Sequence, residues 1–166
     1  MMGAGKSHVG ASLSRTLGLD FYDSDKLVEQ RAGCAVSEVF ERFGEAKFRE
    51  SEKKIILGLL DKAPSVVATG GGAVVNDETL SAIKTRAVSI WLNPDFSVLF
   101  DRLKDKADRP LLQTDNPEET LRALMCGRED RYAQADVNLE ITHDNQSQTL
   151  NSLIKRLSEH LNTARF

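Results

Sequence analysis

The sequence predicts an α/β fold in which parallel strands are covered by helices on both faces. Short apolar runs alternate along the chain with longer segments whose apolar residues recur at helical spacing. Two of these runs, Ser65–Thr69 and Val88–Leu92, are bounded by glycine or proline, as expected of buried strands. A chain of 166 residues is long enough to bury one core, so we expect residues 1–166 to form a single domain.

Four segments are predicted to be strands because they are short and apolar. They are Leu19–Asp23, Ser65–Thr69, Ala87–Asn93 and Val137–Thr142. The second and third are the most apolar, which is typical of parallel strands buried on both faces. No strand is predicted before the first helix, although a sheet of this kind usually opens with one.

The helices are predicted from apolar spacing and from residues that favour helix ends. Gly33 and Gly44 follow two of them as stop signals, and Pro94 and Pro117 open two others at the first turn. The predicted helices are Lys6–Leu17, Ser24–Arg31, Ser37–Phe43, Ala46–Leu60, Asn76–Lys84, Pro94–Lys104, Pro117–Tyr132 and Ser147–Leu161. The leucine stripe of the last helix is predicted to pack into the core rather than against a partner.

Composition and charge exclude several classes of protein. The chain has 22 Lys and Arg against 25 Asp and Glu, a net charge of −3, which disfavours nucleic-acid binding. Two cysteines far apart exclude a disulfide framework and a cysteine zinc site. No apolar run approaches the ~18 residues of a membrane span. We expect a cytoplasmic monomer that binds neither nucleic acid nor membrane.

The amino-terminal Met-Met-Gly-Ala-Gly-Lys-Ser ends as a Walker A phosphate loop ends. Glycines let backbone N–H groups turn toward phosphate oxygens, and the following helix adds its positive end. Lys6 is predicted to reach the β- and γ-phosphates, and Ser7 to bind Mg²⁺. The triplet alone also occurs at ordinary helix starts. The complete pattern needs one more glycine upstream, so we expect that a strand and a glycine are missing here.

Acidic and glycine-rich turns follow two of the predicted strands, where sites of open α/β sheets lie. Of Asp23 and Asp25, one carboxylate is predicted to lie near Mg²⁺ and its waters, and the other to face a substrate hydroxyl. Alternatively, this pair only caps a helix. Gly70, Gly71 and Gly72 form either a tight turn or a place where backbone closely approaches a ligand.

Three arginines are candidates for binding an anionic substrate. Arg49 and Glu52 lie three residues apart on one helical face, either as a surface ion pair or with Glu52 holding Arg49 against a substrate carboxylate. Arg109 lies in a polar segment, about 104–116, that is predicted to be a lid, and would stabilise charge on a transferring phosphoryl group. Arg128 offers a further guanidinium, unless it lies on a solvated helix face.

Taken in order, these motifs resemble those of the shikimate kinase family. The series runs through Gly-Ala-Gly-Lys-Ser, Asp-Ser-Asp, Phe-Arg-Glu-Ser-Glu, Gly-Gly-Gly-Ala, Arg-Pro-Leu-Leu and Arg-x-x-x-Tyr, and spans positions 1 to about 150. The resemblance implies a P-loop kinase fold of the nucleoside-monophosphate-kinase group. This is a three-layer α/β/α arrangement with parallel strands in the order 2-3-1-4-5. Its first strand, which would be central, is missing here.

The resemblance also implies a reaction and its residues. ATP would phosphorylate the 3-hydroxyl of shikimate, with Mg²⁺, on the route to chorismate and the aromatic amino acids. ATP-binding residues would be Gly3, Ala4, Gly5, Lys6, Ser7, His8, Arg102, Arg109 and Gln146. Shikimate-binding residues would be Asp25, Arg49, Gly71, Gly72 and Arg128. Ser7 and Asp23 would hold the metal, and Lys6, Asp25 (as the base) and Arg109 would carry the catalysis.

Two other functions are compatible with the residues alone. Because the phosphate loop is incomplete, the chain could be a noncatalytic module that binds nucleotide or shikimate. Paired arginines around a carboxylate also suit a related kinase that acts on another acid, such as gluconate. The order of the motifs favours shikimate.

Overall fold

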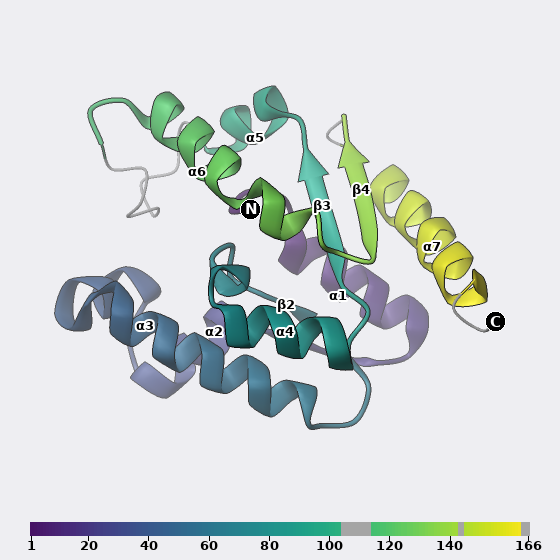
Figure 1. Cartoon of the computed structure of the whole chain (residues 1–166), viewed down its shortest axis with the longest axis horizontal. Coiled ribbons are helices and arrows are strands. Elements are labelled where there is room, and N and C mark those ends of the chain that lie inside the picture. The colour runs from purple at the N-terminus through teal and green to yellow at the C-terminus, as the bar shows by residue number, and fades with distance from the viewer. Residues whose placement is uncertain (104–113, 143–144, 164–166) are drawn as a thin grey trace.

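The computed structural model describes residues 1–103, 114–142 and 145–163, and within them helices and strands alternate (Figure 1). The strands are β1 (Asp20–Asp23), β2 (Ser65–Ala68), β3 (Ile90–Pro94) and β4 (Val137–Ile141). The helices are α1 (Lys6–Leu17), α2 (Ser24–Ala32), α3 (Val36–Leu60), α4 (Asp77–Arg86), α5 (Phe96–Leu103), α6 (Pro117–Tyr132) and α7 (Gln146–Thr163), with a short 3₁₀ helix, η1 (Ala73–Val75). None of the described helices is long and apolar enough to cross a membrane.

The strands form two parallel pairs. β1 pairs with β2, with Asp23 opposite Ala68, and β3 pairs with β4, with Ile90 opposite Val137. Within the described residues β2 and β3 do not hydrogen-bond to each other. The predicted α/β class with parallel strands is confirmed, and the two pairs correspond to the pairs 2-3 and 4-5 of the expected order 2-3-1-4-5.

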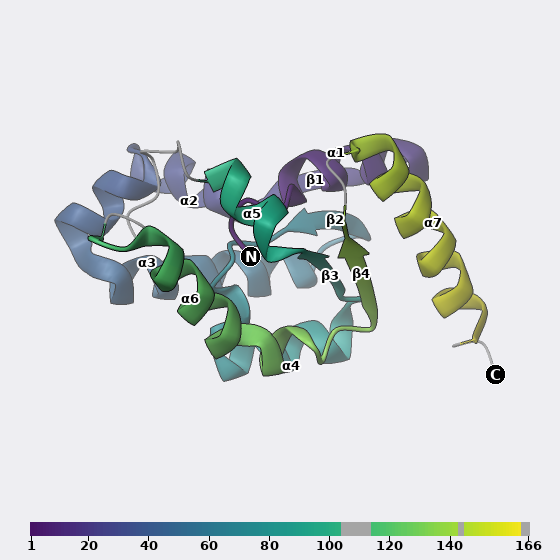
Figure 2. The ribbon, with the colours of Figure 1, turned by 90° about the horizontal axis from the view of Figure 1, so that it is seen from above.

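Helices cover the strands on two sides, as parallel strands require. Figure 2 shows α1 on one side of the strands and α4 on the other. α7 packs against both α1 and β4, and α6 lies against η1 on the side of α4. Asp23 and Thr69, at the carboxyl ends of β1 and β2, line the same cavity as the loop that precedes α1.

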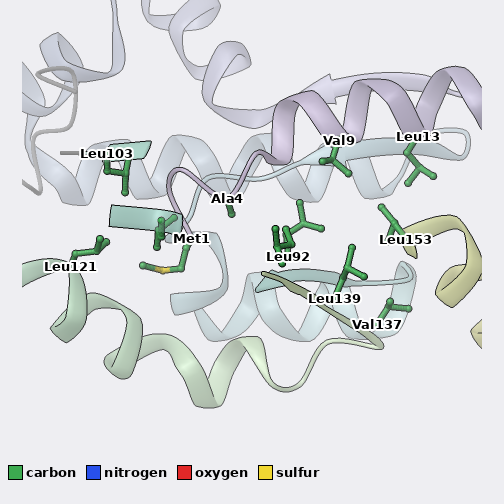
Figure 3. Close-up of a cluster of buried hydrophobic side chains, with 12 residues drawn as sticks. Met1, Ala4, Val9, Leu13, Leu92, Leu103, Leu121, Val137, Leu139 and Leu153 are labelled. Carbon is green, nitrogen blue, oxygen red and sulfur yellow. The ribbon is translucent and has the colours of Figure 1, made fainter. Parts of the chain in front are cut away.

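The buried apolar residues form two clusters. In the larger cluster, Val9 of α1 joins Leu92 and Leu139 of the second strand pair (Figure 3). In the smaller cluster, Val28 of α2 packs with Phe48 of α3. Val66 of β2 packs against the larger cluster and Val67 against the smaller, so β2 contacts both.

Three local features differ from the prediction. The two helices predicted on either side of Gly44 form one element, α3, which is kinked at that residue. Gly44 has φ 77° and ψ 166°, a conformation that glycine adopts more easily than other residues. Pro94 ends β3 instead of opening α5, since a proline at a strand end disrupts no hydrogen bond of the ladder's interior. The sequence did not predict η1.

Candidate active site

The amino-terminal segment forms a tight loop that leads directly into α1. Gly3 and Gly5 have φ values of 73° and 84°, in the left-handed region that glycine tolerates. The ammonium group of Lys6 donates to the Met1 carbonyl oxygen, and Arg102 Nη1 donates to the Gly3 carbonyl oxygen at 3.1 Å. The loop therefore curls back on itself and leaves the first N–H groups of α1 facing outward, where anions bind readily.

A cavity of about 500 Å³ lies over this loop and beside the carboxyl ends of β1 and β2. It brings together the following predicted residues: Gly3, Ala4, Gly5, Lys6, Ser7, His8, Asp23, Asp25, Gly71, Arg102 and Gln146. Ile141 and Thr149 also line it, and the sequence did not point to either. Arg109 lies outside the described residues, as does most of the predicted lid at 104–116.

Asp23 caps α2, as one of the two alternatives for the acidic pair held, and it also contacts Ser7. Its Oδ1 caps α2 by accepting hydrogen bonds from the backbone N–H groups of Asp25 (3.1 Å) and Lys26 (3.3 Å). Its Oδ2 accepts a hydrogen bond from the Ser7 hydroxyl at 2.5 Å. The same carboxylate thus starts α2 and joins it to the start of α1.

Ser7 and Asp23 are suitable ligands for a hard divalent cation. A hydroxyl and a carboxylate are the oxygen donors that Mg²⁺ prefers, and Mg²⁺ usually takes one or two protein ligands together with waters and phosphate oxygens. In the described part of the chain, no group of three or more His, Cys, Asp or Glu could enclose a metal. The donors present fit Mg²⁺ bound jointly by protein and nucleotide.

The predicted residues Arg49, Gly72 and Arg128 do not line this cavity. On α3, Arg49 lies between two carboxylates. Arg49 Nη1 lies 2.7 Å from Glu52 Oε2, and Arg49 Nη2 lies 3.0 Å from Glu45 Oε1. The Glu52 side chain is only 2% exposed, so the alternative of a surface ion pair is wrong. Glu45 was missed, although its position four residues before Arg49 could have indicated the contact.

Burial and charge oppose each other in this pair. Burial raises the pKa of Glu52, and the neighbouring Arg49 only partly offsets that shift. Burial also pulls the pKa of Arg49 down, but Glu52 and then Glu45 raise it above its usual value. Arg49 therefore stays a cation, held in place by the buried carboxylate.

The glycine turn after β2 fits between these charged groups. The Gly70 N–H donates to the Ser24 hydroxyl at 2.9 Å, and a Cβ on Gly70 would lie 2.1 Å from Glu52 Oε1. A Cβ on Gly72 would lie 2.4 Å from Arg49 Cζ. Residues with side chains would displace the carboxylate and the guanidinium, so close approach is the reason for glycine here.

Arg128 reaches the same turn from α6. Its Nη1 donates to the Gly71 carbonyl oxygen at 3.0 Å, and the Tyr132 hydroxyl donates to the same oxygen. Arg128 is only 9% exposed, so the alternative of a solvated helix face is wrong. Burial raises the pKa of Tyr132, which keeps its hydroxyl a donor. Arg49 and Arg128 thus approach the Gly71-Gly72 turn from two different helices.

Comparison with known proteins shows the family of this chain. The family model described as shikimate kinase matches residues 2–158. The chain belongs to the shikimate kinase family. A shikimate kinase of Bradyrhizobium diazoefficiens is 43% identical over 164 residues, which cover 97% of this chain and 78% of that protein. One from Cereibacter sphaeroides is 47% identical over 140 residues, 84% of this chain and 70% of that protein.

Solved structures of the family have the same fold. The shikimate kinase of Acinetobacter baumannii in complex with shikimate superposes with a TM-score of 0.91 at 31% identity, over 95% of this chain and 89% of that one. The enzyme of Aquifex aeolicus gives a TM-score of 0.82 at 33% identity, over 95% and 92%. The P-loop kinase fold expected from the motifs is therefore the fold of this chain.

Proposed function

We propose that this chain transfers the γ-phosphoryl group of ATP to the 3-hydroxyl of shikimate, giving 3-phosphoshikimate and ADP for aromatic amino acid biosynthesis. Membership of the family supports a kinase that uses these two substrates. The observation that carries the assignment is the convergence of Arg49 and Arg128 on the turn that also lines the phosphate-loop cavity.

The two arginines bind the carboxylate of shikimate. Guanidinium groups recognise carboxylates with paired, charge-assisted hydrogen bonds, and Arg49 and Arg128 are partly or fully shielded from water. Gly71 and Gly72 line the acceptor site next to them. Asp25 shares the cavity with the phosphate loop, so an acceptor held by the arginines presents its hydroxyls between Asp25 and the nucleotide.

The phosphate loop binds ATP. The backbone of Gly3, Ala4 and Gly5 and the start of α1 donate N–H groups to phosphate oxygens, with Ser7 and His8 at the same helix end. Lys6 exchanges its contact with the Met1 carbonyl for the transferred phosphate. Two further residues of the cavity wall, Arg102 and Gln146, border the adenine.

Ser7 and Asp23 hold Mg²⁺ together with the nucleotide. Their oxygens are already 2.5 Å apart at the edge of the cavity, a donor set that suits this ion. When bound, Mg²⁺ neutralises negative charge on the phosphate oxygens.

Catalysis rests on positioning and charge stabilisation. Asp25 accepts the proton of the 3-hydroxyl as the new O–P bond forms and the bond between the γ-phosphorus and the ADP oxygen breaks. Lys6 stabilises the charge on the transferring group, and we assign the same role to Arg109 of the lid. Closing the site excludes water, which would otherwise compete as acceptor.

We further propose that the enzyme works as a cytoplasmic monomer that binds neither nucleic acid nor membrane. Its net charge of −3 gives no broad attraction for a phosphate backbone or an anionic surface. Size-exclusion chromatography with light scattering measures the mass, and a mass of two chains would contradict this part of the proposal.

An assay that couples ADP release to NADH oxidation tests the function. ADP release should depend on shikimate and be weak with gluconate, which lacks the ring. Asp25→Asn should retain shikimate binding in calorimetry and lose turnover. ADP release independent of the acceptor, or equal rates with gluconate, would contradict the proposal.

A further inference from the structure

The glycine turn, η1 and α4 form one hydrogen-bonded unit. The N–H groups of Ala73 and Val75 donate to carbonyl oxygens of the turn at 3.2 and 3.0 Å. Asn76 follows directly and caps α4, because its side-chain oxygen accepts a hydrogen bond from the Thr79 N–H at 2.9 Å. We call residues 70–86 the turn–helix unit. No linker separates its parts, so the position of α4 fixes the position of the turn.

The turn–helix unit lies between the two helices that carry the arginines of the acceptor site. In Figure 1, α4 lies between α3 and α6, and η1 packs against both of these helices. Arg49 of α3 lies against Gly72, and Arg128 of α6 donates to the Gly71 carbonyl oxygen. The spacing between the two guanidinium groups is therefore set by how α3 and α6 are held against this unit.

Two ion pairs hold α3 against α4. Lys53 Nζ lies 2.8 Å from Glu78 Oε2. Lys53 follows Arg49 by four residues, about one helical turn, so this contact lies on the same part of α3 as the arginine. Near the other ends of the two helices, Arg86 Nη1 lies 2.6 Å from Asp61 Oδ1. Contacts at two separate points fix the angle between the helices as well as their distance.

The carboxyl-terminal part of α6 is held to the turn–helix unit in a similar way. Arg131 Nη1 donates to the Asp77 carboxylate and to a carbonyl oxygen of η1. Arg131 follows Arg128 by three residues, so the two lie close together on α6. Just beyond the end of α6, Gln134 Oε1 accepts a hydrogen bond from Lys84 Nζ at 3.1 Å. The turn–helix unit thus contacts each neighbouring helix at two places.

The two contacts nearest the arginines come from adjacent residues of α4. Glu78 binds Lys53 of α3, and Asp77 binds Arg131 of α6. Both carboxylates lie in the first turn of α4, where the helix dipole also favours negative charge. Ion pairs as exposed as these add little to the stability of a fold. Their main consequence is geometric, because they join α4 to two different helices at one point.

We propose that Asp77 and Glu78 are positioning residues for the acceptor. By holding α6 and α3 against the turn–helix unit, they set the spacing at which the two arginines meet one substrate carboxylate. This inference rests on the proposed function, and both residues act through the arginines and not on the substrate. Paired hydrogen bonds between guanidinium groups and a carboxylate require a defined geometry, so a small shift of either helix weakens binding.

Initial rates and calorimetry test this inference. Asp77→Asn combined with Glu78→Gln should raise the KM for shikimate about fivefold and weaken shikimate binding by the same factor, because both helices are held less firmly. The KM for ATP and kcat should stay within about twofold, because neither α3 nor α6 carries the phosphate loop. A merely structural role would instead lower the folded fraction, and with it the apparent kcat, without changing the KM for shikimate.

A double-mutant cycle shows whether the ion pair itself is responsible. Lys53→Gln leaves α4 unchanged but breaks the same contact as Glu78→Gln. Each change should raise the KM for shikimate by a similar factor, and both together by no more than either alone. Glu50→Gln is the matched control. Glu50 adjoins Arg49, but its ion pairs are with two lysines of its own helix, so the KM should be unchanged.

The possible outcomes separate this inference from the proposed function. Additive effects in the cycle, equal rises in both KM values, or an equal effect of Glu50→Gln would overturn the role of Asp77 and Glu78. A parent chain that binds no shikimate in calorimetry would overturn the proposed function, and this inference with it. A parent that binds shikimate no more tightly than the variant of Asp77 and Glu78 would overturn this inference alone.

Discussion

The acceptor side and the phosphate side of the candidate active site are built in different ways. On the acceptor side, charged side chains are already fixed: Glu52 and Glu45 hold Arg49, and the Gly71 carbonyl holds Arg128. On the phosphate side, the loop is held by contacts to its own carbonyl oxygens, from Lys6 to Met1 and from Arg102 to Gly3. The acceptor side is thus preorganised, whereas the phosphate loop must exchange partners when a nucleotide binds.

The largest effect is expected from the phosphate side. Lys6→Ala should lower kcat by at least about 1000-fold, because no other described side chain of the loop carries positive charge to the transferred phosphate. Shikimate binding in calorimetry should be unchanged, because the acceptor side does not depend on Lys6. Lys26→Ala, an exposed lysine at the start of α2, is the control. A kcat within tenfold of the parent would remove Lys6 from the mechanism.

A substitution on the acceptor side should change the KM for shikimate, and not kcat alone. Arg49→Ala should raise the KM for shikimate by a factor equivalent to roughly 2–4 kcal/mol, because it removes a charge-assisted contact with the carboxylate. The KM for ATP should stay within about twofold. Arg42→Ala, an exposed arginine of the same helix, should change neither constant. Equal rises for both substrates would show that the two sides are not separate.

A smaller effect is expected from the partners of Arg49. Glu45→Gln should raise the KM for shikimate only about two- to fivefold, because Glu45 is half exposed and Glu52 still holds the guanidinium. Initial-rate measurements at saturating ATP give this constant. A rise as large as that of Arg49→Ala would mean that the exposed carboxylate, and not the buried one, organises the acceptor side.

The smallest effect on activity is expected far from both sides, at Asp136. Burial acts to raise the pKa of this carboxyl, but hydrogen bonds from the Ser89 hydroxyl and N–H outweigh it and lower the pKa. The ionised form is therefore favoured by folding. The stability it contributes is present above the unfolded pKa of about 3.9 and is lost as the pH falls through the folded value.

Asp136→Asn should make the free energy of unfolding depend less on pH at acid pH. Urea unfolding at a series of pH values gives the free energy of unfolding, and the difference between parent and variant should shrink as the pH falls below about 4. Both KM values should be unaltered at neutral pH. A difference that is independent of pH would contradict the ionic origin of the contact.

Most helices and strands of the fold could be predicted from local sequence patterns. Apolar periodicity predicted every described strand and nearly every helix. A helix that buries one face has apolar residues at helical spacing, and a buried strand is a short apolar run, so both leave a pattern in the sequence. The predicted ends of the elements differ from the observed ones by a few residues. Pro94, for example, can end a strand or begin a helix, and the sequence analysis assigned it to the helix, whereas it ends β3. The kink at Gly44 was predicted as a stop, since a glycine marks a break without saying whether the helix resumes.

By itself, then, the sequence determined where strands and helices form and which residue types could bind phosphate and carboxylate, because these depend on neighbours along the chain. Only the tertiary structure decided that Glu52 is buried, that Arg128 faces a glycine turn and that Asp23 both caps a helix and meets Ser7. It also decided that the strands stand as two pairs. Burial and pairing across distant segments depend on packing in three dimensions, which residue spacing does not encode.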